Sequence, residues 1–89
     1  DLVSQFASLV AERRAVYGHP AANLQMIAEL WTALLRPKLG GYELTALDVC
    51  SMMRLVKEAR LQQTPDHVDS LGDLVGYTDC SVQVINGPE

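Results

Sequence analysis

Apolar residues recur at spacings of three and four along most of this 89-residue sequence, and this period limits the fold more than any other property. Such spacing lays one apolar stripe along an α-helix, whereas a half-buried strand alternates apolar and polar residues. No alternating stretch occurs in the sequence. The sequence therefore predicts an all-α protein.

Glycine and proline divide the pattern into four helical segments. The predicted helices span Leu2 to Tyr17, Pro20 to Pro37, Ala46 to Gln63 and Pro65 to Asn86. Pro37 marks the end of the second helix, and Gly87-Pro88 the end of the fourth. Thr45 and Thr64 carry hydroxyl side chains of the kind that cap helix N-termini.

Short connections favour antiparallel packing between successive helices. The expected fold class is a small antiparallel four-helix bundle, with the last two helices forming a C-terminal hairpin. The chain mass of 9.8 kDa suits one domain that covers residues 1–89. Because a domain of this size has a thin core, we also expect a homo-oligomer.

Composition excludes several classes of protein. Hydrophobic residues make up 48% of the chain and charged residues 20%, which excludes disorder. A net charge of -4 argues against nucleic acid as a partner, and no apolar run is long enough to predict a membrane span. Cys50 and Cys80 lie in helical patterns rather than in a CxxC motif, so we expect a reducing, cytoplasmic location.

Polar side chains fall inside the apolar arcs of the second and third helices. At 100° per residue, one face of the third helix carries Val49, Met52, Met53, Leu55, Val56 and Ala59. Asp48 and Arg60 lie within that arc, Lys57 lies at its edge, and Asn23 shares a face with apolar residues of the second helix. A buried charge or amide is costly unless paired, so these four are candidate site residues. Alternatively, Asp48 serves its own helix N-terminus and Asn23 tethers a neighbouring backbone group.

The fourth helix combines an apolar stripe with an adjacent face of acidic and small residues. The predicted core stripe consists of Val68, Leu71, Leu74, Val75, Val82 and Ile85. Beside it lie Asp69, Gly72, Asp73 and Gly76. Glycine inside a helix costs about 1 kcal/mol relative to alanine, and carboxylates four residues apart repel each other. The glycines therefore predict close approach of another backbone or a ligand, and the carboxylates predict a cation or basic partners.

An antiparallel hairpin of the last two helices brings basic groups to these carboxylates. Residues at matching depth predict pairs of Arg60 with Asp69 and of Lys57 with Asp73, with His67 nearby at the mouth of the hairpin. In a plainer alternative the pairs are salt bridges that only set helix register, and His67 is a capping or solvent-exposed residue.

Short motifs in both halves of the sequence form a recognisable combination. The first group is Arg14-Ala15-Val16-Tyr17-Gly18-His19-Pro20, Asn23, Ile27 and Leu30-Trp31. The second group is Asp48-Val49, Met52-Met53, Lys57, Ala59-Arg60, Pro65, His67, Asp69-Ser70, Asp73 and Gly76-Tyr77. Together they resemble a phage-encoded family of small helical domains of unknown function. The resemblance extends from Arg14 to Tyr77 and implies a protein of the host cell cytoplasm.

More distantly, the layout is similar to the MazG-like all-α nucleotide pyrophosphohydrolases. Those enzymes hold Mg²⁺ with helix-borne carboxylates, an ExxE pair followed by an ExxD pair, and hydrolyse nucleoside triphosphates to monophosphates and pyrophosphate. The similarity implies a nucleotide or another small anionic ligand. This chain has neither ExxE nor ExxD, so its status as an enzyme stays open.

The similarity to these enzymes implies roles for the candidate residues. The metal ligands would be Asp48, Asp69 and Asp73, holding Mg²⁺. The ligand-binding residues would be Asn23, Lys57 and Arg60, and the catalytic residue would be His67, which assists proton transfer.

Two alternatives stay open. The missing glutamate pairs and the thin core favour a non-catalytic phage protein that binds a host protein or sequesters a small nucleotide. The polar cluster is otherwise only a device that sets helix register. None of these readings includes nucleic acid or a membrane as a partner.

Overall fold

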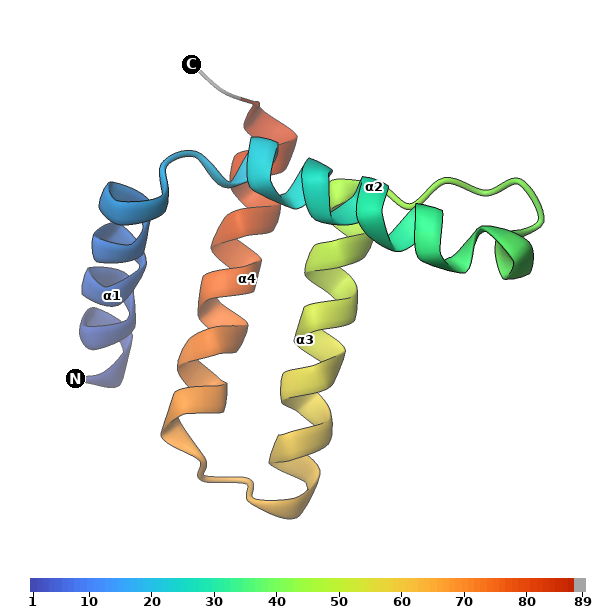
Figure 1. Cartoon of the computed structure of the whole chain (residues 1–89). Helices are drawn as coiled ribbons and strands as arrows, with labels where there is room; N and C mark the ends of the chain where they lie inside the picture. Colours follow the sequence, from blue (N-terminus) through green and yellow to red (C-terminus); the bar gives the residue numbers. More distant parts are fainter. Residues whose placement is uncertain (88–89) are drawn as a thin grey trace.

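The computed structural model describes residues 1–87, apart from the side chain of Tyr17, and this range contains four α-helices and no strand. They are α1 (Leu2–Tyr17), α2 (Pro20–Leu39), α3 (Ala46–Gln63) and α4 (Val68–Asn86). The predicted small all-α bundle with a C-terminal hairpin is confirmed (Figure 1). Pro88, predicted to help stop the last helix, lies outside the described residues.

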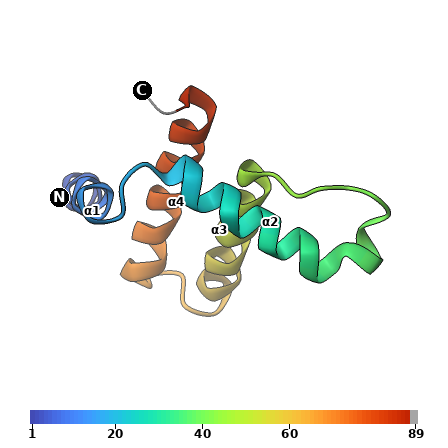
Figure 2. The ribbon, with the colours of Figure 1, turned by 45° about the horizontal axis from the view of Figure 1, so that its top comes forward.

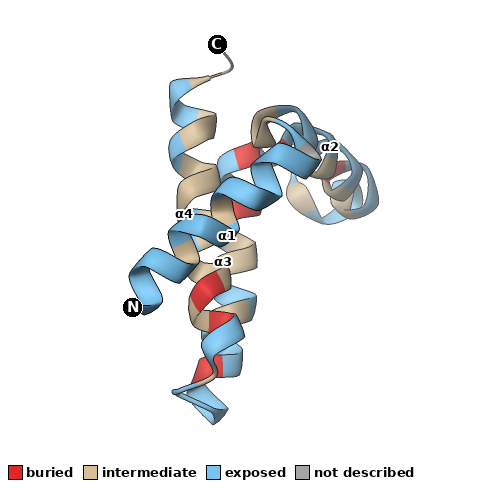
Figure 3. Ribbon diagram, turned by 90° about the vertical axis from the view of Figure 1, so that its left-hand side faces the viewer, coloured by how far each residue is buried: buried red, intermediate tan, exposed pale blue. Residues whose placement is uncertain are grey.

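The helices form a flat body. Helices α3 and α4 make the antiparallel hairpin, α1 lies beside α4, and α2 crosses the hairpin rather than running along it (Figures 1 and 2). The body measures 44 × 37 × 18 Å, so its thinnest dimension is about two helices thick. Buried residues are consequently confined to a few turns (Figure 3).

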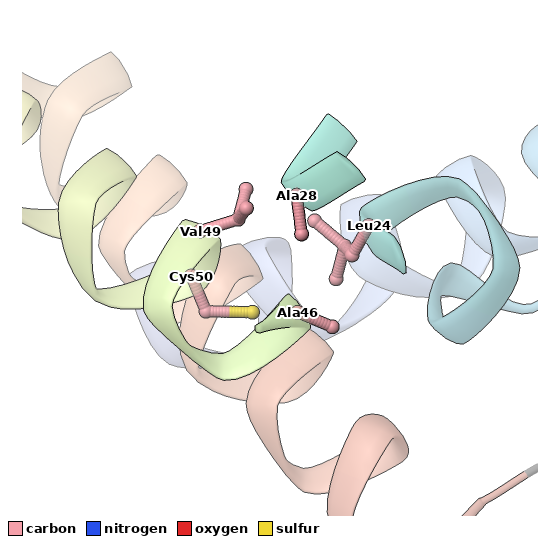
Figure 4. Packing of buried hydrophobic residues seen from close by; sticks show 5 residues of the cluster. All are labelled: Leu24, Ala28, Ala46, Val49 and Cys50. Carbon is pink, nitrogen blue, oxygen red and sulfur yellow. The ribbon is translucent and has the colours of Figure 1, made fainter. Parts of the chain in front are cut away.

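The core lies where α2 crosses α3. It consists of Leu24 and Ala28 from α2 with Ala46, Val49 and Cys50 from α3 (Figure 4). Most of these side chains are small, which lets the two helix backbones approach closely at the crossing. Trp31 and Met53, both half-buried, pack against this cluster and extend it toward α4.

A buried threonine holds the segment that returns from α2 to α3. The Thr32 hydroxyl donates to the Ala28 carbonyl at 2.7 Å and accepts from the Leu44 N–H at 2.9 Å. Because Thr32 is only 4% exposed, losing either partner would leave a buried polar group unsatisfied. This pair of bonds therefore fixes the entry of the chain into α3.

The prediction that α2 ends at Pro37 is wrong. Pro37 lies inside the last turn, and the helix continues to Leu39. A proline near a helix end removes one hydrogen bond but does not by itself stop the helix. Gly40, in the left-handed conformation with φ of 57°, ends it, and the Tyr42 N–H donates to the Leu39 carbonyl just beyond.

The prediction that α4 begins at Pro65 with Thr64 as its cap is also wrong. The Thr64 N–H still donates to the Arg60 carbonyl, so Thr64 closes α3. The His67 N–H donates to the Thr64 carbonyl, which places Pro65 at the second position of a turn between the helices. His67 is the N-cap of α4, because its Nδ1 accepts from the Ser70 N–H at 3.2 Å.

The predicted core stripe of α4 is only partly buried: Leu71 and Leu74 are half-buried, and its other four residues are exposed. Ser70 and Gly72 are buried, whereas Val75 is 43% and Ile85 70% exposed. Leu55, on the predicted apolar face of α3, is also exposed. The small and polar face of α4 meets α1 and α3 instead, because glycine permits close approach and partners satisfy its polar groups.

Close approach is found at Gly72 only, and the group that approaches is a side chain of α1, not the predicted backbone or ligand. A Cβ at Gly72 would lie 2.8 Å from Phe6 Cε1, whereas at Gly76 its nearest neighbour would be Arg13 Nη1 at 3.6 Å. The first distance is a clash and the second is an ordinary contact. Gly72 therefore sets how closely α1 lies against α4.

Gly76→Ala and Gly72→Ala form a matched test of this packing. Both gain helix propensity of up to about 1 kcal/mol, but Gly72→Ala must also displace the Phe6 ring. We expect Gly76→Ala to raise the free energy of unfolding measured in urea. Gly72→Ala should raise it by less or should lower it. Equal gains from both variants would contradict the close packing of Phe6.

Candidate functional site

A pocket of about 280 Å³ lies where all four helices meet, and we call it the central pocket. Its volume is near the lower end of the range for small-molecule sites. Its apolar wall is formed by Val10, Leu24, Ile27, Trp31, Val49 and Met53. Its polar residues are Arg13, Arg14, Asn23, Asp73, Tyr77 and Asp79. A mostly apolar cavity with a few convergent polar groups is the usual composition of a ligand site.

One carboxylate joins three helices at this pocket. Arg13 Nη1 of α1 lies 3.3 Å from Asp73 Oδ1, and Lys57 Nζ of α3 lies 3.1 Å from Asp73 Oδ2. The Asp73 side chain is 21% exposed, so its charge is partly removed from water. Two cations share this single anion, which leaves the cluster with an excess of positive charge.

Two other polar groups of the pocket stay neutral near neutral pH. Burial raises the pKa of the Tyr77 phenol above its ordinary value, with Lys57 opposing the shift and Asp73 adding to it. Burial likewise raises the pKa of the Cys80 thiol. Neither group adds charge to the pocket, so its field comes from the arginines, Lys57 and the carboxylates.

Of the two predicted pairs across the hairpin, one is confirmed and one is wrong. Lys57 binds Asp73. Arg60 and Asp69 are both exposed, and the described residues show no ion pair between them. Asn23 is exposed at the central pocket, where it contributes to the lining rather than to a core tether.

The remaining predicted residues cap helices. Asp48 Oδ2 accepts from the Thr45 N–H and from the Tyr42 hydroxyl, each at 2.9 Å, and forms a capping box at the start of α3. His67 caps α4, with its Nδ1 2.8 Å from Ser70 Oγ. Within residues 1–87, no three His, Cys, Asp or Glu side chains gather closely enough to hold a metal ion. Asp48 therefore does not join Asp69 and Asp73 in one metal set.

The sequence did not predict the arginines of the pocket or the hydrogen bonds by which Arg54 joins α3 to α4. Arg13 was visible as a charge within the apolar spacing of α1, a signal of partial burial. Arg54 of α3 donates to Ser81 Oγ at 2.7 Å and to the Tyr77 carbonyl at 3.4 Å, both on α4. These two hydrogen bonds hold α3 against α4.

Residues 2–85 match a family described as a domain of unknown function, DUF6378. The chain is 36% identical over 77 residues to the Gene 55 protein of Mycobacterium phage D29, which covers 86% of this chain and 48% of that protein. It is 39% identical over 66 residues to the Gene 55 protein of Mycobacterium phage L5, covering 74% of this chain and 40% of that protein.

The chain therefore spans less than half the length of these two phage proteins. No solved structure matches it. The resemblance to a phage-encoded family of helical domains is confirmed, whereas the similarity to MazG-like enzymes stays a prediction. None of the described helices is long and apolar enough to cross a membrane.

Asp73→Asn tests the shared carboxylate. The variant leaves two cations without their counter-charge, so we expect the free energy of unfolding in urea to fall by about 1–2 kcal/mol. Asp69→Asn is the control, and its expected loss is about 0.5 kcal/mol because it only removes a charge near the start of α4. Equal losses would show that the ion pairs at Asp73 contribute nothing.

The capping box predicts a pH-dependent contribution to stability. The hydrogen bond from the Thr45 backbone holds the pKa of Asp48 below its ordinary value of 3.8, so the contribution is fully present above pH 3.8 and is lost as the pH falls from there through the lowered pKa. We expect Asp48→Ala to cost about 1 kcal/mol near neutral pH. The difference from the parent chain, measured by urea unfolding, should shrink as the pH is lowered below 3.8. A constant difference would contradict this cause.

Proposed function

We propose a binding function for this chain, which belongs to the DUF6378 family of domains of unknown function: its central pocket takes a small organic phosphate of the nucleotide class. The observation that carries the proposal is one cavity that combines an apolar, aromatic wall with two adjacent arginines. An apolar wall suits a planar base, and guanidinium groups suit phosphate oxygens.

The base is assigned to the apolar wall of the pocket. Ile27, Trp31 and Met53 provide apolar and aromatic surface there, and Tyr77 lies on the α4 side. Stacking of a base on an aromatic ring contributes about 1–3 kcal/mol and tolerates any base. The volume of about 280 Å³ suits one ring system, so the phosphates would lie at the mouth.

The phosphate is assigned to Arg13 and Arg14. Arg13 is 46% exposed and holds Asp73, which also has Lys57 as a partner. A phosphate can therefore recruit Arg13 while Asp73 keeps its bond to Lys57. Arginine binds phosphate through two parallel N–H donors, which lysine does not provide.

The remaining polar groups suit the edge of a nucleoside. Asn23 has both donor and acceptor atoms at the pocket, and the Asp79 carboxylate accepts from amino or hydroxyl groups. Mg²⁺ enters the proposal only as the counter-ion of a polyphosphate, held by one pocket carboxylate together with phosphate oxygens. The proposal is therefore binding, and hydrolysis is one outcome to be measured.

The setting proposed for this binding is the cytoplasm of the infected host cell. The support is the likeness to proteins of two mycobacterial phages. In that compartment nucleotides are abundant, and a binding domain would sequester or sense them.

Trp31 is the single tryptophan of the sequence and lines the pocket, so its fluorescence serves as the probe. We expect nucleoside mono- and triphosphates, with and without Mg²⁺, to change its emission in a saturable way. The corresponding nucleosides and inorganic phosphate should bind at least about tenfold more weakly, since each lacks one half of the recognition. Pyrophosphate release, assayed in parallel, separates binding from hydrolysis.

Matched arginine variants locate the site. Arg13→Gln and Arg14→Gln should each weaken nucleotide binding by about tenfold, because each removes a charge-assisted bond to phosphate. Arg60→Gln changes the same charge on the exposed surface of α3 and should leave binding unchanged. An absence of any fluorescence or calorimetric response would remove the proposal. Equal weakening by Arg60→Gln would move the phosphate site away from the pocket.

A further inference from the structure

Helix α4 carries a largely apolar outer face, on which four aliphatic side chains are exposed, Leu71 is half-buried and Thr78 is an exposed polar residue. This outer α4 face consists of Val68, Leu71, Val75, Thr78, Val82 and Ile85. Val68 and Val82 are each 46% exposed and Ile85 70%, and no charged residue belongs to the face. Scattered apolar residues are common on a surface, but a continuous stripe on one helix marks an interaction site.

The spacing of the outer α4 face is that of a helix–helix seam. Its residues follow one another at intervals of three and four, the heptad period by which two helices pack side by side. Such a stripe is ordinarily buried. Within this chain, however, α1 and α3 pack on the other side of α4, against Gly72, Asp73 and Ser81.

The surface area of the chain indicates how much is left uncovered. The exposed area is 6179 Å², whereas a compact monomer of this mass exposes about 5,200 Å². The difference is about 1,000 Å², and one partner in a standard protein–protein interface buries about 800 Å². This excess belongs to the whole flat chain, and its size is compatible with one standard interface.

We infer that the outer α4 face binds the same face of a second copy, which gives a two-fold symmetric homodimer with the two α4 helices at its centre. In a two-fold dimer the same patch meets itself, so the patch must tolerate its own charge. The chain carries a net charge of -4, yet this face is neutral, so two copies meet there without direct repulsion. A charged or strongly polar partner would have to bury its polar groups against these apolar side chains without hydrogen-bond partners.

This dimer is independent of the proposed nucleotide site. The α4 residues that line the central pocket are Asp73, Gly76, Tyr77, Asp79 and Cys80, and none belongs to the outer α4 face. Dimerisation therefore leaves the pocket open, and the two proposals fail separately.

Sedimentation equilibrium of the 89-residue chain tests the dimer. We expect a mass of about twice 9.8 kDa that falls toward the single-chain mass on dilution. Val75→Asp and Val82→Asp each place charges opposite each other across the two-fold axis and should give the single-chain mass with unchanged helical circular dichroism. Leu34→Asp is the control, because Leu34 is 78% exposed on α2, and it should leave the dimer intact.

Val75→Thr covers the case in which the aspartate variants do not fold. It keeps the branched shape but adds a hydroxyl, and it should raise the dimer dissociation constant by about tenfold. A parent chain with the single-chain mass at every concentration would overturn the inference and would leave the face to another protein. A dimer that survives all three valine variants, or that Leu34→Asp disrupts, would overturn the assignment to this face.

Discussion

The close packing of α1 onto the small residues of α4 is the constraint on which the central pocket depends. Gly72 admits the Phe6 ring where a Cβ would clash, and the Arg13 guanidinium lies at ordinary contact distance from Gly76 one turn later. This approach carries Arg13 to Asp73 and sets Val10 and Arg14 in the pocket lining. Without it, Asp73 would keep only Lys57, and one side of the pocket would be missing.

Local chemistry allowed most helix boundaries to be predicted. Thr45 and Asp48 form the expected capping box, and the Leu2–Tyr17 helix begins and ends as its apolar spacing indicates. The end of α2 and the start of α4 differ from the prediction, because in each case a neighbouring residue determines the boundary. Gly40 rather than Pro37 ends α2, because a left-handed residue reverses the chain whereas a proline only removes one donor.

The start of α4 differs for a comparable reason. Thr64 is a good N-cap by residue type, but its carbonyl, which would have to accept the first hydrogen bond of α4, accepts from the His67 N–H in the turn between the helices. His67 takes the capping role through a ring nitrogen, and histidine is not among the residues favoured at that position. Propensity rules weigh side chains one at a time, so they do not register that a backbone group is already engaged.

Only part of the candidate site could be predicted. The position of a residue along the hairpin follows from its sequence distance to the turn, but the direction in which its side chain points depends on how the helices pack. Lys57 and Asp73 match in both respects and form the ion pair. Arg60 lies three residues beyond Lys57, which turns its side chain back by about 60° around the α3 axis and out to solvent. The contribution of Arg13 depends on where α1 packs, a long-range fact that spacing within one helix does not contain.

The spacing of apolar residues predicts that a helix face is buried, but it does not show which partner covers that face. Helix α4 is an example. Its apolar face was assigned to the core because that face has the stronger hydrophobic signal, yet the chain packs on the glycine-containing face instead. A body about two helices thick has few fully buried residues. Apolar side chains therefore stay accessible to solvent both at the wall of the central pocket and on the outer α4 face. Any partner that covers either surface and binds only the folded chain stabilises the fold, by an amount that grows with the partner's concentration relative to its Kd. The thin core and the two uncovered surfaces are therefore consequences of the same architecture.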